Sequence, residues 1–151
     1  MSQPRTSGRV YMLSNVPSLG STPFLALLNS GGGVLLLREW RVYAESPSAF
    51  AVNFTPIYSI RMATGASPSG SLTAVELTST GLATSAQGCT AFIGGPSFTT
   101  LLTLTLNYRK GIFWEAKRGK EFSIYAATSG WDVQQNGGGD NVYNHSFVYE
   151  E

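Results

Sequence analysis

Few residues of this chain have side chains suited to covalent chemistry. The sequence contains one histidine, His145, and one cysteine, Cys89. A general base or an activated nucleophile needs a partner that orients it, and no sequence pattern supplies such a partner for either residue. His145, flanked by Asn144 and Ser146, is expected to be a partly exposed strand residue, and Cys89 is expected to be a small buried apolar residue.

The carboxylates also form no convincing catalytic or metal-binding pattern. Glu115 and Glu121 are the candidate acid and base pair for glycoside hydrolysis, but they flank a predicted hairpin turn and are expected to pair with the basic residues at 117, 118 and 120. Residues 137–141, Gly-Gly-Gly-Asp-Asn, are one imperfect copy of a calcium-binding repeat and supply too few oxygen ligands. We therefore expect no catalytic residue, no metal site and no cofactor, and the chain is not expected to be an enzyme.

Basic residues gather at 109–110 and 117–120, with Phe113 and Trp114 between them. Aromatic side chains between basic ones are typical of nucleic-acid platforms, but these groups fall at predicted strand ends, where charge normally lies in water. The formal net charge is +1 and charged residues make up 13% of the chain, about half the usual share. No apolar run approaches the roughly 18 residues of a membrane span. Neither nucleic acid nor a membrane is therefore an expected partner.

The predicted strands are organised around residues 23–43, the densest apolar stretch of the chain. Two apolar runs flank the turn at 29–33, Asn-Ser-Gly-Gly-Gly, and predict a β-hairpin whose second strand lies in the middle of a sheet. Along residues 34–43, Trp40 and Val42 fall on one face, whereas Leu35, Leu37 and Tyr43 fall on the other. Arg38 and Glu39 interrupt the apolar run, which indicates a β-bulge or a strand leaving the core.

The rest of the chain predicts short strands joined by turn-rich loops, with no helical periodicity. Expected strands cover residues 9–13, 50–54, 56–62, 98–106, 112–116, 121–126 and 142–149, and residues 72–82 fit a weak strand or a short helical turn. Trp131 is expected in a loop, where an aromatic side chain marks a contact surface. The prediction is an all-β, single-domain antiparallel jelly roll or β-sandwich over residues 9–151, preceded by an extended, flexible N-terminal arm at 1–8.

Several segments in order resemble one family. They are Gly8-Arg-Val10, residues 23–29, a glycine turn, residues 34–39, a Leu/Thr strand at 101–106 and the ending Phe147-Val-Tyr-Glu-Glu151. Together they resemble the jelly-roll capsid decoration, or cement, proteins of tailed bacteriophages and related virion modules. Residues 1–9 lack the apolar stretch of a secretory signal, so synthesis without export is expected. The resemblance implies a host cytoplasm as the place of synthesis, a homotrimer, the major capsid protein as partner and a place on the outer surface of the virion. The residues expected to bind partners are Arg5, Arg9, Leu35, Leu37, Tyr43 and Trp131.

Two other function classes stay open at this point. A receptor- or carbohydrate-binding head domain of a phage tail fibre or baseplate would use Trp114, Trp131 and Tyr143 as an exposed sugar-binding surface. A glycan-cleaving enzyme would need two carboxylates facing each other across a cleft.

Overall fold

The computed structural model describes residues 8–15, 25–31, 33–44, 56–106, 111–137 and 143–151. Within these residues the chain is all-β, its strands pair antiparallel, and no helix is present, as the sequence predicts. The expected arm at 1–8, apart from Gly8, and the expected strand at 50–54 lie outside the described residues. The strands are β1 (Val10–Asn15), β2 (Ala26–Leu28), β3 (Leu35–Ala44), β4 (Ile57–Thr64), β5 (Ser67–Ser69), β6 (Val75–Glu76), β7 (Gln87–Cys89), β8 (Ala91–Ile93), β9 (Ser97–Thr105), β10 (Ile112–Glu115), β11 (Phe122–Ile124), β12 (Gly130–Gly137) and β13 (Tyr143–Glu150).

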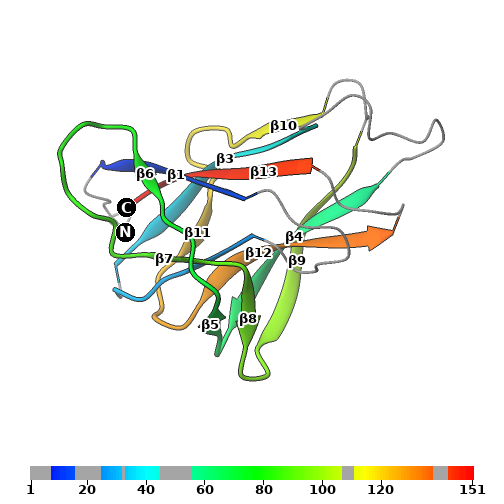
Figure 1. Ribbon diagram of the computed structural model, residues 1–151, viewed down its shortest axis with the longest axis horizontal. Helices are drawn as coiled ribbons and strands as arrows, with labels where there is room; N and C mark the ends of the chain where they lie inside the picture. The colour runs from blue at the N-terminus through cyan, green and yellow to red at the C-terminus, as the bar shows by residue number, and fades with distance from the viewer. Residues whose placement is uncertain (1–7, 16–24, 32, 45–55, 107–110, 138–142) are drawn as a thin grey trace.

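Two larger sheets hold most of these strands (Figure 1). Sheet A has the order β10-β3-β13-β1-β6, and β11 also pairs with β3. Sheet B has the order β7-β2-β12-β4-β9, and sheet C is the ribbon β5-β8. One apolar cluster draws its buried side chains from both larger sheets, including Trp40 and Phe147 from sheet A and Tyr58 and Trp131 from sheet B. The inner faces of sheets A and B therefore share one core.

Sheet C forms a small additional layer. A second apolar cluster joins Ala26 and Leu28 of β2 and Ala63 of β4 to Cys89 and Phe92. Alternate residues of a strand face opposite sides of the sheet, and Leu25 and Leu27 belong to the first cluster. The second cluster therefore lies on the outer face of sheet B, where β8 covers it. Cys89 is buried there, as the sequence predicts.

Strand β3 lies in the interior of sheet A, as predicted, because β13 pairs along one side of it and β10 and β11 along the other. Of the two alternatives predicted at Arg38 and Glu39, a β-bulge or a strand leaving the core, the bulge is present. Val148 pairs with Glu39 and Tyr149 with Leu37, so Arg38 is the extra residue. A bulge shifts the alternation of side chains by one position. Leu35 and Leu37 consequently face the same core as Trp40, and the prediction that they lie on the opposite face is wrong.

The predicted hairpin at 23–43 is wrong. Strand β2 pairs with β7 and β12 in sheet B, whereas β3 belongs to sheet A, so the glycine turn carries the chain from one sheet to the other. The Asn29 backbone N–H donates to the Ser129 carbonyl at 2.8 Å, and Asn29 Nδ2 donates to the Gly33 carbonyl at 2.7 Å. Long-range partners therefore decide which sheet each apolar run joins.

Two further local predictions are corrected. Trp131 lies in β12, a central strand of sheet B, and not in a loop. Strands β10 and β11 do not form a hairpin, because both run antiparallel to β3 and follow each other along the same side of it. The undecided stretch 72–82 contributes β6, a two-residue strand that pairs with β1.

Gly130 of β12 lies against Leu27, which precedes Leu28 in β2, and against Phe92 of the ribbon. A Cβ atom at this position would lie 2.3 Å from the Leu27 carbonyl oxygen and 2.6 Å from Phe92 Cζ. We expect Gly130→Ala to lower the free energy of unfolding by about 1–3 kcal/mol, because the methyl group forces backbone and ring apart. Gly33→Ala is the control, since nothing lies within 4 Å of that position. Urea denaturation of both variants checks this, and equal stabilities would contradict the expected clash.

Candidate partner-binding surfaces

The six residues predicted to bind partners lie in three different environments. Leu35, Leu37 and Trp131 are fully buried in the core, and none of them presents surface that a partner could touch. Their prediction as contact residues is therefore wrong, because the bulge in β3 and the central position of β12 turn them inward. Arg5 lies outside the described residues.

Arg9 and Tyr43 remain at the surface. The Arg9 guanidinium lies 3.3 Å from a carboxylate oxygen of Glu151, and its side chain is half-buried. Tyr43, near the end of β3, is 49% exposed. Of the predicted contact residues, Tyr43 thus offers the largest apolar surface to a partner.

The alternative sugar-binding surface does not form as predicted. Trp131 and Tyr143 are both buried in the core. Trp114 is half-buried, and its ring stacks on Phe122 with 5.2 Å between ring centroids. The three aromatic residues therefore do not share an exposed face.

An exposed aromatic surface does exist on the outer face of sheet A. Antiparallel pairing of β10 with β3 places Phe113 opposite Arg41, and the Arg41 guanidinium lies 5.5 Å from the centre of the Phe113 ring. Tyr43 follows two positions later and faces the same side. Phe113 is 62% exposed. We call Arg41, Tyr43 and Phe113 the aromatic–arginine patch.

A charged hollow of about 320 Å³ adjoins this patch. Its charged residues are Arg38, Glu39, Glu115 and Arg118, and Val10, Ala116 and Val148 complete the lining. Glu39 also pairs with Arg41 of the patch, with Arg41 Nε 2.8 Å from Glu39 Oε2. Patch and hollow are therefore one continuous surface that combines aromatic, basic and acidic side chains.

Arg38 lines the charged hollow and forms ion pairs with residues on two other segments. Its guanidinium forms ion pairs with Glu121 and Glu150, which the sequence did not predict. Of the expected basic partners at 117, 118 and 120, Arg118 also acts on Glu121 through its charge. Burial opposes ionisation of Glu121, but backbone N–H donors and the positive charges of Arg38 and Arg118 outweigh it, and the pKa of Glu121 lies below its usual value. The extra residue of the bulge thus forms ion pairs with two carboxylates and helps to keep Glu121 ionised.

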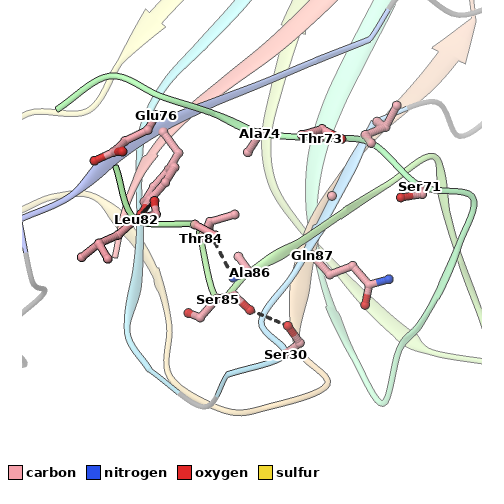
Figure 2. Close-up of a pocket in the computed structure, with 14 residues that line it drawn as sticks. Ser30, Ser71, Thr73, Ala74, Glu76, Leu82, Thr84, Ser85, Ala86 and Gln87 are labelled. Atoms are coloured by element: carbon pink, nitrogen blue, oxygen red, sulfur yellow. Dashed lines mark hydrogen bonds between the residues drawn. The ribbon is translucent and has the colours of Figure 1, made fainter. Parts of the chain in front are cut away.

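A second hollow, the hydroxyl-lined groove of about 380 Å³, lies beside β6 (Figure 2). Ser30, Ser71, Thr73, Thr84 and Ser85 line it, together with Gln87 and the exposed side chain of Leu82. Ser30 Oγ donates to the Ser85 carbonyl, and the Ala86 N–H donates to Thr84 Oγ1 at 3.1 Å. These bonds fix the wall of a largely uncharged groove.

Residues 149 and 151 form hydrogen bonds to the same wall of the groove. Glu151 accepts hydrogen bonds from the Ser85 N–H at 2.9 Å and from Thr84 Oγ1 at 3.0 Å. Tyr149 donates its hydroxyl to Thr84 Oγ1 at 2.8 Å. Glu76 is the carboxylate that lines the groove, and it already accepts from Thr80 and Gly81 within its own loop. The groove can therefore hydrogen-bond a neutral polar group.

Residues with reactive side chains are buried away from both hollows. His145 is fully buried against Tyr58, with 4.6 Å between ring centroids, which corrects the prediction of a partly exposed residue. Burial lowers the pKa of His145 to about 3 and raises the pKa of the Cys89 thiol to about 11. Over the described ranges, no group of three or more His, Cys, Asp or Glu side chains could hold a metal ion. The same ranges contain no helix long and apolar enough to cross a membrane.

Comparisons with family models, curated proteins and solved structures find no match to this chain. They assign no family and leave the resemblance to phage decoration proteins untested. Sequence reasoning identified Tyr43 but missed Arg41 as its neighbour, and it treated Phe113 as part of a basic cluster. Only the pairing of β10 with β3 brings these three side chains together.

Proposed function

We propose that this chain is a structural virion protein that binds the outer surface of a phage capsid as an oligomer and stabilises the shell. Two antiparallel sheets around one core support the finer description of the fold as a jelly-roll β-sandwich. Pairing of strands far apart in sequence, such as β1 with β13 and β2 with β12, is the kind of connectivity that a jelly roll requires. The resemblance described above implies three copies and the major capsid protein as partner.

The aromatic–arginine patch carries this proposal. Interfaces between proteins are enriched in Tyr, Phe and Arg, and a few such residues supply most of the binding energy. Tyr43, Arg41 and Phe113 lie on paired strands of sheet A, so their backbone is already ordered before a partner arrives. The adjoining charged hollow supplies both signs of charge, which gives orientation to a docked protein surface.

Co-sedimentation with undecorated capsids tests the proposal. We expect the wild-type protein to pellet with capsids, and the double variant Tyr43→Ala/Phe113→Ala to bind about thirtyfold more weakly, which corresponds to the roughly 2 kcal/mol of a hot-spot residue. Tyr125→Ala is the matched control, because Tyr125 is 53% exposed and lies outside the patch. Circular dichroism establishes that each variant is folded.

Two results would contradict the proposal. Wild-type protein that stays in the supernatant at micromolar capsid concentrations would remove the capsid as partner. Equal binding by the double variant and the wild type would remove the patch as the contact surface. A glycan array on the same samples tests the alternative receptor-binding function, and glycan binding without capsid binding would favour that alternative.

A further inference from the structure

Among the described residues, the outermost strands at three of the four edges of the larger sheets are short, and two of these edges also carry charged or covering segments. At one edge of sheet A, β6 has two residues. At the other edge, β10 and β11 are short and are separated by a turn that contains Lys117, Arg118 and Lys120. In sheet B, β7 has three residues, and Leu72 already forms a bridge to Gly88. Short strands, charged residues and covering segments are the usual means by which proteins prevent edge pairing.

Strand β9, the fourth edge, has almost none of these protections. It is nine residues long, Ser-Phe-Thr-Thr-Leu-Leu-Thr-Leu-Thr, and contains no charged residue and no proline. None of its residues is buried, and within the described part of the chain it pairs with β4 alone. Thr, Leu and Phe fit a pleated, half-buried surface well. A bulge at Leu101, between the pairs Ile60–Leu102 and Arg61–Thr100, divides the strand and leaves residues 102–105 as its regular half.

The hydrogen bonds of β9 show which backbone groups point away from the sheet. The Leu106 N–H donates to the Pro56 carbonyl at 2.8 Å, toward β4. In an antiparallel ladder, residues that exchange hydrogen bonds alternate with residues whose backbone groups point the other way. Leu104 and Leu102 therefore bond to β4, and the N–H and C=O groups of Thr103 and Thr105 point outward from the edge.

We infer that β9 pairs antiparallel with β9 of a second copy of this chain, about a two-fold axis at Leu104. In this register Thr103 of one copy lies opposite Thr105 of the other, and each such pair exchanges both N–H···O bonds. Thr–Thr pairs face each other on the outer side, and the two half-buried Leu104 side chains meet on the inner side. The uncharged strands approach without like-charge repulsion, and sheet B continues across the axis.

The strand most suited to pair with the β9 edge is β9 of a second copy of the chain. Among the described edge strands β9 is the longest, so the matching edge for it is β9 of a second copy, and a two-fold axis makes the contact self-complementary. The inference is independent of the proposed capsid function. It specifies pairs of chains, whereas the resemblance implies three copies, and the mass of the particle in solution distinguishes them.

Sedimentation velocity over a range of concentrations tests the inference. We expect wild-type protein to form a species of twice the chain mass of 16.2 kDa.

Variants at Thr105 test the pairing register. Thr105→Pro removes an outward N–H without affecting the bonds to β4, and so removes half of the intermolecular bonds formed by Thr103 and Thr105. Thr105→Lys places like charges near the axis. We expect each variant to raise the dissociation constant at least tenfold, and Thr105→Ser to leave it unchanged. Leu82→Lys, a charge on a different exposed apolar residue, is also expected to leave it unchanged.

Hydrogen exchange supplies a second measurement that does not depend on variants. The amides of Thr103 and Thr105 should exchange more slowly at high protein concentration than at low concentration. A monomeric or three-copy wild-type protein would overturn the inference. So would pairs that persist in folded Thr105→Lys protein, or amides at 103 and 105 whose exchange is independent of concentration.

Discussion

Replacing Arg61 by methionine is expected to lower the free energy of unfolding by about 3–5 kcal/mol at neutral pH, because it leaves a buried carboxylate without its counter-charge. Asp132 has no exposed surface, and both of its oxygens accept from Arg61, Nε to Oδ1 at 2.9 Å and Nη2 to Oδ2 at 2.6 Å. The Arg61 guanidinium also lies over the Phe98 ring, 3.7 Å from its centre. Methionine retains an apolar side chain beside that ring, so the main effect of the substitution is the loss of the positive charge that faces Asp132.

The dependence of this loss on pH identifies its cause. Burial raises the pKa of Asp132 above its usual value, although the hydrogen bonds and charge of Arg61 partly oppose the rise. Without Arg61 the pKa rises further, and the folded variant then binds a proton more readily than the unfolded chain. Protonation of Asp132 should therefore favour the folded variant as the pH falls, whereas His145 acts equally on both proteins, so the deficit of the variant relative to wild type should be smaller in weak acid than at pH 7.

Two further variants complete this experiment. Arg61→Met/Asp132→Asn removes the charge from both sides and should recover at least about 1 kcal/mol relative to Arg61→Met alone. Arg41→Met breaks the exposed pair with Glu39 and should change stability by no more than about 1 kcal/mol. Urea denaturation at several pH values measures all three. The explanation fails if Arg61→Met is no more destabilising than Arg41→Met.

The buried Arg61–Asp132 pair also explains why sequence reasoning missed β12. Trp131 and Val133 alternate with Asp132 and Gln134, which is the period-two pattern of a strand. The neighbours Gly130 and Asp132 nevertheless indicated a loop. An aspartate without a counter-charge is costly in a sheet interior. Its partner lies 71 residues away in the sequence. No local pattern could show that the charge is compensated, although the alternation itself was a usable signal.

Strand β3 shows what local patterning can and cannot predict. The interruption at Arg38 and Glu39 correctly indicated the bulge, because two charged residues cannot continue an apolar face. The consequence for Leu35 and Leu37 depended on where the extra residue lies relative to β13, which only the pairing of Val148 and Tyr149 reveals. The destination of the chain after Asn29 is likewise set by bonds to residues 128–129. Turn chemistry alone does not distinguish a hairpin from a crossing between sheets.

The surfaces were less predictable than the core. Arg41, Tyr43 and Phe113 are adjacent because β10 pairs with β3 in one particular register, and a shift of one residue would turn Phe113 to the other face. The uncharged composition of β9 was visible in the sequence and was correctly interpreted as a strand. That this strand lies at an edge follows only from the order of strands in sheet B.

Acidification is expected to destabilise the protein through His145 before most carboxylates titrate. Burial lowers the pKa of His145 from 6.5 to about 3 in the folded state, whereas the unfolded chain retains the usual value. Between these values the unfolded state binds more protons, so stability falls as the pH falls through this window. One pKa unit corresponds to about 1.4 kcal/mol, which gives a loss of about 2 kcal/mol between pH 6.5 and pH 5 and of the order of 4 kcal/mol by pH 3.

The variant His145→Gln separates this contribution from that of the carboxylates. Glutamine is neutral throughout the window, so the variant should lose the slope between pH 6.5 and pH 5 while retaining the acid transition of groups such as Glu121, whose pKa is lowered in the folded state. Urea denaturation at half-unit pH intervals gives both curves, and NMR titration of the imidazole gives the folded-state pKa directly. An imidazole that titrates near 6.5 in the folded protein, or parallel curves for the two proteins above pH 5, would show that the ring is not buried as neutral imidazole between Trp40 and Tyr58.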